Sequence, residues 1–267
     1  MAEINSKDLF SRTPTYHNDA DAAYLLPNDP IEQSRLIDQH NGIVALVKHV
    51  IHAPVSSPNT VLDIGCGTGI VTRYLSSHFP TAQQVYGIDL SAVPSQPSDT
   101  NLSNLSFICG NFRKIGGTDP RLSLNSVDFV YSRLLLCGMT DWPGYFRVKS
   151  GSGYALYERG GALQGLDLDA GLTVRKYMED AGFVDIQRWE FRIPYWRVPG
   201  ADSEAMTEHL IGDKWGLYWH MIPKLVAPMN FSQEKIDGFR RDMKRDLQEE
   251  EGKEQLFCVT IGRKPVL

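Results

Sequence analysis

A glycine-rich segment that follows an acidic residue carries the clearest chemical signal in the sequence. It runs from Val61 to Gly69 (VLDIGCGTG), with glycine at every second position from Gly65 and with Asp63 two residues before the first glycine. Glycine lets a chain turn tightly and lets its backbone approach a bound nucleotide. Dinucleotide sites use a different spacing, GxGxxG, before a helix whose N-terminus faces a pyrophosphate. The segment therefore indicates a different nucleotide-like ligand, with a purely structural tight turn as the alternative.

A second acidic residue stands twenty positions after Gly69. Asp89 lies at the end of the run QQVYGIDL, where a carboxylate can accept hydrogen bonds from both hydroxyls of a ribose. Asp89 could instead cap a helix, but the next segment, SAVPSQPSDTNLSN, is too rich in proline and serine for a regular helix. S-Adenosylmethionine has a ribose, a cationic sulfonium, an ammonium and a carboxylate, but no phosphate. Because Asp63 places negative charge before the glycines, the sequence favours this cofactor.

The surrounding sequence predicts short strands that alternate with helices. Apolar runs predict strands at 60–64, 83–90, 105–110, 126–135, 153–158, 184–196 and 256–265. Helical spacing predicts helices at 30–51, 69–78, 139–148 and 171–183, and one that begins after Ser232. This alternation is typical of a doubly wound α/β fold, in which a parallel sheet carries helices on both faces.

Several segments resemble a known enzyme class. The residues at 61–69 resemble motif I, VLDxGxGxG, of the class I S-adenosylmethionine-dependent methyltransferases. The runs YLLPNDPIEQSRLIDQH (24–40), DWPGYF (141–146) and GRKP (262–265) are similar to segments of the fungal LaeA-like group. That group contains small-molecule methyltransferases of secondary metabolism and a global regulator of it. The resemblance covers most of residues 60–196 and implies a Rossmann-like sheet of about seven strands whose last strand is antiparallel.

The elements and the resemblance together predict four parts of the chain. Residues 1–55 form an arm and a helix that cover the cofactor site, and residues 56–199 form the Rossmann-like methyltransferase core. Residues 200–254 form a helical cap insertion, and residues 255–267 return as the final core strand. The region around 148–170 is shorter than in relatives, which would open the acceptor side and separate cofactor binding from turnover.

The resemblance also implies roles for individual residues. Gly65 and Gly67 would line the methionine part of the cofactor, and Asp89 would hold the ribose. Asn111 stands where many relatives have an aspartate that accepts the adenine amino group, so its side-chain oxygen would make that contact. The predicted cofactor-binding residues are Tyr24, Arg35, Asp63, Gly65, Cys66, Gly67, Asp89, Leu90, Asn111, Phe112, Ser132 and Arg133.

Three of these residues have an alternative role of similar weight. Phe112 packs either on the adenine or in the core. Arg35 pairs either with the cofactor carboxylate or with its helical neighbours Glu32 and Asp38. Arg133 lies either at the site or in a surface salt bridge. His40, on the apolar stripe of the same helix as Arg35, is either a core histidine or a ligand contact.

The acceptor side is indicated by an aromatic-rich run within the predicted cap. Trp215, Tyr218 and Trp219 suit a planar, apolar metabolite, although they could simply pack the cap onto the core. His220 is the candidate general base because imidazole titrates near neutral pH. The run HLIGDKWGLYWH lacks the HExxH spacing of zinc enzymes, so we expect no metal.

Composition restricts the partners. The formal net charge of −5 argues against a nucleic-acid partner, because phosphate binding needs a concentrated basic surface. No apolar run approaches the roughly 20 residues that a membrane span needs, and the first residues are polar. We therefore expect no membrane partner and a cytoplasmic location, with the nucleus and a homodimer left open.

We predict from these features an S-adenosylmethionine-dependent O- or N-methyltransferase that acts on a small aromatic secondary metabolite. Two alternatives stay open. One is a LaeA-like regulator that works through protein partners. The other is an enzyme that uses the bound cofactor to catalyse a rearrangement without methyl transfer.

Overall fold

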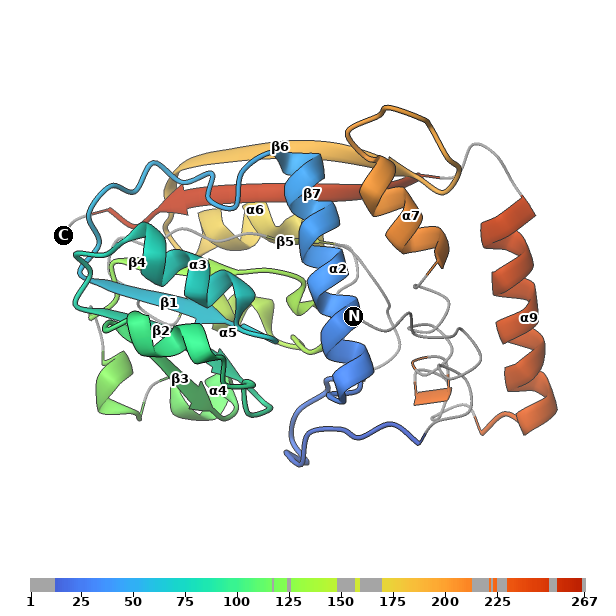
Figure 1. The fold of residues 1–267 in the computed structure, drawn as a ribbon, viewed down its shortest axis with the longest axis horizontal. Coiled ribbons are helices and arrows are strands. Elements are labelled where there is room, and N and C mark those ends of the chain that lie inside the picture. Colours follow the sequence, from blue (N-terminus) through green and yellow to red (C-terminus); the bar gives the residue numbers. More distant parts are fainter. Residues whose placement is uncertain are drawn as a thin grey trace.

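The computed structural model describes residues 13–116, 118–123, 126–147, 157–158, 170–212, 221, 223–224, 230–249 and 254–265 (Figure 1). The helices are α2 (Pro30–Val47), α3 (Ile70–His78), α4 (Phe112–Ile115), α5 (Trp142–Arg147), α6 (Ala170–Asp180), α7 (Glu204–Gly212) and α9 (Gln233–Glu249). The strands are β1 (Thr60–Ile64), β2 (Gln84–Asp89), β3 (Leu105–Cys109), β4 (Phe129–Ser132), β5 (Tyr157–Glu158), β6 (Val184–Pro194) and β7 (Glu254–Arg263). Short 3-10 turns lie at Pro97–Asn101, Pro120–Leu122 and Leu135–Cys137.

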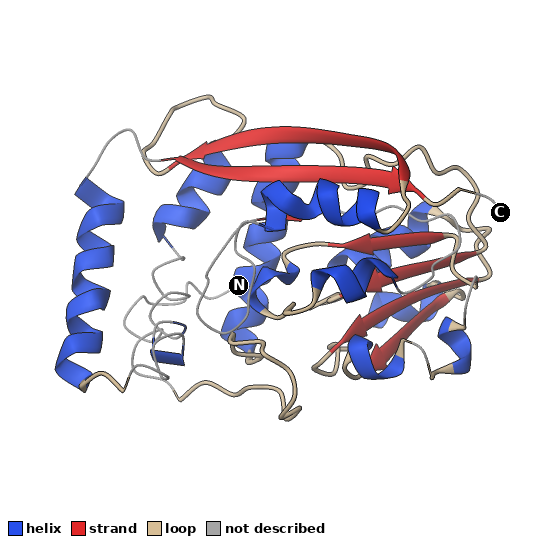
Figure 2. Cartoon of the chain, turned by 180° about the vertical axis from the view of Figure 1, so that it is seen from behind, coloured by secondary structure: helices blue, strands red, loops and turns tan. Residues whose placement is uncertain are grey.

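The strands form two sheets. Four parallel strands pair in the order β3-β2-β1-β4, and the other three pair in the order β5-β7-β6. Strand β7 runs antiparallel to both of its neighbours, as expected for the last strand. Figure 2 shows the long β6–β7 pair above the parallel strands. The α/β Rossmann-like architecture is confirmed, but within the described residues β4 and β5 belong to different sheets, so one sheet of about seven strands is not confirmed.

The parallel sheet is buried on both faces. In β1, Val61 packs into one apolar cluster with residues of α2 and α3, whereas Leu62 and Ile64 pack into another with residues of α5 and α6. Side chains along a strand alternate between the two faces, so a strand that is apolar on both sides needs helices above and below it. This three-layer arrangement leaves the carboxyl ends of β1, β2 and β3 as the edge where polar side chains can gather.

Helix α2 stands across the ends of the parallel strands (Figure 1). It begins at Asp29, whose carboxylate accepts the N–H groups of Ile31 and Glu32, and it ends at Lys48 in the left-handed conformation. A Cβ at Gly42 would lie 2.8 Å from the sulfur of Met206 in α7, so the two helices approach closely. The predicted N-cap and helix are therefore present, and α2 packs on the core beside α7.

The predicted helical cap at 200–254 is not confirmed. Its first helix, α7, packs into the core, where the hydroxyl of Thr207 donates to the carbonyl of Pro194 at 2.9 Å. Helix α9 begins after Ser232 as expected, but Phe239 on its apolar stripe is 39% exposed. No helix in the described part of the chain is both long and apolar enough to cross a membrane.

Strand β4 is shorter than the predicted strand at 126–135. It ends at Ser132 because Leu134 adopts a left-handed conformation with φ 59°, which breaks the extended chain. At its start, the Asp128 carboxylate accepts the N–H groups of Asn59 and Thr60 at 2.9 Å each. Arg133 consequently stands on a turn at the carboxyl end of β4.

Candidate cofactor site

The glycine segment forms a tight turn against the end of β2. Gly65, Gly67 and Gly69 have positive φ angles of 70°, 55° and 74°, which side chains rarely tolerate. The N–H groups of Gly65 and Cys66 donate to the carbonyl of Ile88 at 2.8 and 3.0 Å. A Cβ at Gly65 would lie only 2.3 Å from Cδ2 of Leu135. The positive φ angle therefore requires glycine at position 65, and a Cβ there would also force Cδ2 of Leu135 to shift.

Asp89 closes this turn from β2. One carboxylate oxygen accepts the N–H of Gly67 at 2.8 Å, and the other accepts the N–H of Ser91 at 3.0 Å. Burial raises the pKa of Asp89, and its hydrogen bonds to Ser91 and Gly67 act in the opposite direction. Each carboxylate oxygen can accept a further hydrogen bond. Asp89 thus fixes the glycine turn and still offers acceptors at the edge of the sheet.

Asp63 lies beneath the turn and is almost completely buried. Its carboxylate accepts the hydroxyl hydrogen of Thr72 in α3 at 2.7 Å. Burial raises the pKa of Asp63 to about 7, with Asp89 acting in the same direction and Thr72 and Arg133 acting against it. A buried carboxyl group that titrates near neutral pH can respond to a nearby cation by losing its proton.

The raised pKa predicts how stability depends on pH. Between the ordinary value of 3.8 and about 7, the folded protein holds a proton on Asp63 that the unfolded chain has lost. The free energy of unfolding should therefore fall as the pH rises through this range. Asp63→Asn cannot hold this proton. In thermal unfolding, the stability of the variant relative to the wild type should therefore rise from about pH 5 to about pH 8. Asp202→Asn, at the exposed ion pair with Lys48, is the control, and parallel curves for Asp63→Asn would contradict the assignment.

Helix α2 contributes a buried arginine whose guanidinium makes only some of the hydrogen bonds that it can donate. Nε and Nη2 of Arg35 donate to the two oxygens of Glu32 at 2.9 and 2.6 Å, and both residues are buried. Nη1 of Arg35 is also buried and has no hydrogen-bond partner among the described residues. Tyr24 interacts electrostatically with Glu32 and Arg35. Burial, Glu32 and Asp89 raise the pKa of Tyr24 well above the ordinary value. An unpaired guanidinium N–H in a buried place is costly unless a ligand oxygen accepts it.

The N-terminal arm, residues 13–29, crosses the segments that follow β2 and β3. Asn28 donates to the hydroxyl of Ser91 at 3.0 Å, and Lys114 in α4 forms ion pairs of 2.8 Å with Asp19 and Asp21. Within the arm, Nε2 of His17 lies 3.0 Å from the carbonyl oxygen of Tyr24. These contacts hold the arm against the same edge of the sheet that carries Asp89.

Three of the predicted residues take part in local contacts. Asn111 caps α4 by accepting the N–H of Arg113 at 3.0 Å, and its side chain also bonds Asp19. Phe112 packs edge-on against Tyr145 with 6.0 Å between ring centroids, on the core side. Ser132 is fully buried and accepts the hydroxyl hydrogen of Tyr145 at 3.0 Å. Ser132 therefore supports the edge from below and is closed to solvent.

The remaining predicted residues are placed as follows. Cys66 is buried within the glycine turn, and burial raises the pKa of its thiol well above the ordinary value. The carbonyl of Leu90 lies 3.7 Å from the sulfur of Cys109, at the ends of β2 and β3. Nη2 of Arg133 lies 3.0 Å from Nδ1 of His40 in α2. The candidate base His220, with the aromatic run 215–219, lies outside the described residues and stays a prediction.

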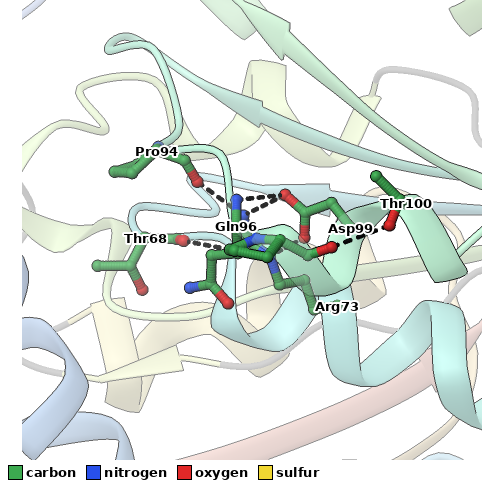
Figure 3. A network of polar contacts seen from close by, with 7 residues as sticks. Thr68, Arg73, Pro94, Gln96, Asp99 and Thr100 are labelled. Atoms are coloured by element: carbon green, nitrogen blue, oxygen red, sulfur yellow. Dashed lines mark hydrogen bonds and ion pairs between the residues drawn. The ribbon is translucent and has the colours of Figure 1, made fainter.

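Sequence reasoning missed a polar network that fixes the segment after β2 (Figure 3). Arg73, in the first turn of α3, donates from Nε and Nη2 to Asp99 at 2.5 and 2.9 Å. Its other bonds reach the carbonyls of Thr68 and Pro94, both at 2.7 Å. The guanidinium also lies 5.0 Å from the ring centroid of Phe107. The proline-rich segment is thus tied to the glycine turn, and the signal available in the sequence was an arginine one turn after Gly69.

The network predicts what happens when Arg73 is replaced by a side chain that cannot make all of its hydrogen bonds. Arg73→Lys keeps the charge but cannot reach Asp99, Thr68 and Pro94 together, so we expect a loss of about 1–3 kcal/mol of stability. Hydrogen exchange of the backbone should rise across residues 91–101. Arg121→Lys is the matched control, because Arg121 makes a similar two-bond pair with Asp119 on the surface and should cost less than about 1 kcal/mol. Equal effects of the two changes would remove the special role of Arg73.

Among the described residues, no group of three or more histidine, cysteine, aspartate or glutamate side chains is arranged to hold a metal ion.

Comparison with known proteins shows which proteins this chain is similar to. Residues 61–148 match the family model described as methyltransferase domain. The chain is 26% identical over 212 residues to methyltransferase pytC of Aspergillus terreus, covering 67% of this chain and 63% of pytC. It is 27% identical over 282 residues to N-methyltransferase sirN of Leptosphaeria maculans, covering 91% and 95%. It is 32% identical over 135 residues to secondary metabolism regulator laeA of Monascus pilosus, covering 49% and 35%.

One solved structure supports the fold alone. The cyclopropane-fatty-acyl-phospholipid synthase-like protein of Lactobacillus casei superposes with a TM-score of 0.53 at 13% identity, covering 97% of each chain. The resemblance to class I S-adenosylmethionine-dependent methyltransferases, and to the fungal LaeA-like group among them, is confirmed. The matched residues, 61–148, resemble a methyltransferase domain of this class, whose cofactor is S-adenosylmethionine.

Proposed function

We propose that the protein binds S-adenosylmethionine at the carboxyl ends of β1, β2 and β3 and transfers its methyl group to a small molecule. The observation that carries the proposal is the pairing of Asp89 with the glycine turn. One carboxylate both holds the N–H of Gly67 at 2.8 Å and keeps lone pairs for ribose hydroxyls. A structural turn alone would not need a half-buried acid whose acceptors exceed its protein partners.

Each charged part of the cofactor has a suitable group among the described residues. Asp63 supplies negative charge beneath the turn for the ammonium and the sulfonium. Nη1 of Arg35, buried and without a partner among the described residues, suits the carboxylate, and Tyr24 lies beside it. Gly65 and Gly67 bring the backbone close, and Cys66 lies between them. This division of charges is the fit expected for a cofactor that has a cation and a carboxylate but no phosphate.

The adenine would be recognised from β2 and β3. Asn111 has one acceptor lone pair beyond the bond from Arg113, and Phe112 and Leu90 offer apolar surface. Arg133 would supply positive charge at the end of β4, and Ser132 lies beneath it. Residues 13–55 would cover the bound cofactor and exclude water, since the arm already contacts Ser91 and α4.

The bound cofactor supplies an electrophilic methyl group, and the protein supplies orientation, proximity and desolvation. We propose a small aromatic acceptor with oxygen or nitrogen as the methylated atom, and His220 as its general base. The sirN relative, named as an N-methyltransferase, supports nitrogen as the methylated atom. The negative net charge supports an acceptor other than nucleic acid.

A second candidate function is favoured by one observation. The aligned relative laeA is named a secondary metabolism regulator, and its match is confined to 135 residues. The same cofactor site would then serve a protein that acts through protein partners. The two functions differ in whether a methylated metabolite is formed.

Calorimetry with S-adenosylhomocysteine and with methylthioadenosine tests the proposal. We expect both to bind and the first to bind more tightly, because only S-adenosylhomocysteine carries the carboxylate that Arg35 would receive. Absence of binding by either compound would refute the proposed site. Incubation of a metabolite extract with methyl-labelled cofactor then separates the functions, since a labelled product supports the enzyme and binding without product supports the regulator.

A further inference from the structure

Helix α2 and the end of β4 are joined by a hydrogen bond between a histidine and an arginine. Nη2 of Arg133 lies 3.0 Å from Nδ1 of His40, and the two residues are 93 positions apart. Arginine has only donors, so Nδ1 of His40 must be the acceptor and its proton must sit on Nε2. A charged imidazolium could not make this bond.

His40 lies where it stays neutral. The residue is only 8% exposed, and burial together with the Arg133 charge lowers the pKa of His40 to about 4. The bond is thus intact throughout the neutral pH range. His40 is a fixed acceptor that faces the strand ends, at a place where an apolar core residue would have sufficed for packing.

Strand pairing brings the residue held by His40 close to the buried acid of the glycine segment, because Asp63 in β1 pairs with Tyr131 in β4, and Ile64 pairs with Ser132, the residue before Arg133. Arg133 acts against the rise in the pKa of Asp63, and it bonds the side chain of Tyr131, which is 4% exposed. The described ionisable groups that interact with Asp63 are Arg133, Asp89, Cys66 and Tyr131. Arg133 is the cation of this set, so its position controls how readily Asp63 carries negative charge.

We propose that His40 is a positioning residue that holds the guanidinium of Arg133 beside Asp63 and thereby couples helix α2 to the glycine turn. The inference rests on the proposed function for its consequence, which is that an ionised Asp63 favours the cationic cofactor. Its structural part, the link from His40 through Arg133 to Asp63, can be tested without any ligand.

The test compares His40→Leu, which fills similar volume without an acceptor, with His40→Asn, whose side-chain oxygen can replace Nδ1. The readout is the titration of the Asp63 carboxyl carbon in the ligand-free protein, assigned with Asp63→Asn. We expect His40→Leu to move the midpoint of Asp63 upward by at least about half a pH unit, because Arg133 is no longer held in place. His40→Asn should titrate like the wild type.

The same variants are then titrated with S-adenosylhomocysteine between about pH 6 and about pH 8, a range that includes the midpoint expected for Asp63. We expect the acid limit of binding in His40→Leu to shift upward with the Asp63 midpoint. An unchanged midpoint in a folded His40→Leu would overturn the inference, as would a shifted midpoint in His40→Asn. The result for His40→Asn decides the question even if His40→Leu does not fold. If the wild type binds no S-adenosylhomocysteine, the proposed function fails while the ligand-free titration still decides the link.

Discussion

Gly65→Ala is expected to destabilise the protein by about 2–5 kcal/mol and to remove cofactor binding. The residue has φ 70°, and its Cβ would lie 2.3 Å from Cδ2 of Leu135. A left-handed conformation costs an alanine about 1–2 kcal/mol, and forcing an atom into packed space costs about 1–3 kcal/mol more. Urea unfolding and calorimetry with S-adenosylhomocysteine measure the two effects.

The neighbouring glycine provides a matched control for this change. Gly67 has φ 55°, but its Cβ would meet only Cδ1 of Leu36 at 3.5 Å, an ordinary contact. Gly67→Ala should therefore lose only the stability that the left-handed conformation costs an alanine. The double variant Gly65→Ala/Leu135→Ala should lose less stability than the sum of the losses of the two single variants. Equal stability losses for the two glycine variants would show that Leu135 does not restrict position 65.

Asp89→Ala is expected to weaken S-adenosylhomocysteine binding by about 10- to 150-fold, which corresponds to about 1.5–3 kcal/mol for hydrogen bonds to a charged group. The change removes the acceptor for ribose hydroxyls and also the acceptor for the N–H groups of Gly67 and Ser91. Calorimetry at fixed pH measures the affinity.

A ligand that lacks the 2′-hydroxyl separates these two contributions. If Asp89 receives that hydroxyl, the wild type should prefer S-adenosylhomocysteine over its 2′-deoxy analogue, and Asp89→Ala should lose the preference. If the variant keeps the full preference, Asp89 acts only on the turn. An unchanged affinity for S-adenosylhomocysteine would take Asp89 out of the site.

The parts of the molecule that follow from local sequence were predictable. The strand, glycine turn and helix at 60–78 occupy one continuous stretch, and their signals are short apolar runs and glycines that need positive φ. The start of α2 at Asp29 and of α9 at Ser232 also depends on local capping. Asp89 could be placed at the edge because the carboxyl ends of neighbouring parallel strands meet there.

The parts that depend on distant residues were not predictable. The end of β4 is set by Leu134 in a left-handed conformation, which an apolar run hides. Helix α7 packs into the core because Met206 meets Gly42, a contact between residues 164 positions apart by their numbers in the chain. For the site, sequence reasoning weighed Glu32 as the partner of Arg35, which it is, but it could not find the bond from His40 to Arg133.

The contacts of the N-terminal arm and of helix α2 also bear on the order in which the chain can fold. The arm reaches Ser91 across 63 positions, and α2 reaches Arg133 across 93. During synthesis from the N-terminus, these partners of the arm and of α2 do not yet exist when the helix leaves the ribosome. Contacts of such long sequence separation slow folding, because the intervening loop must close first. Helix α2, which lies at the edge of the sheet, would then be made early and would be among the last elements to dock.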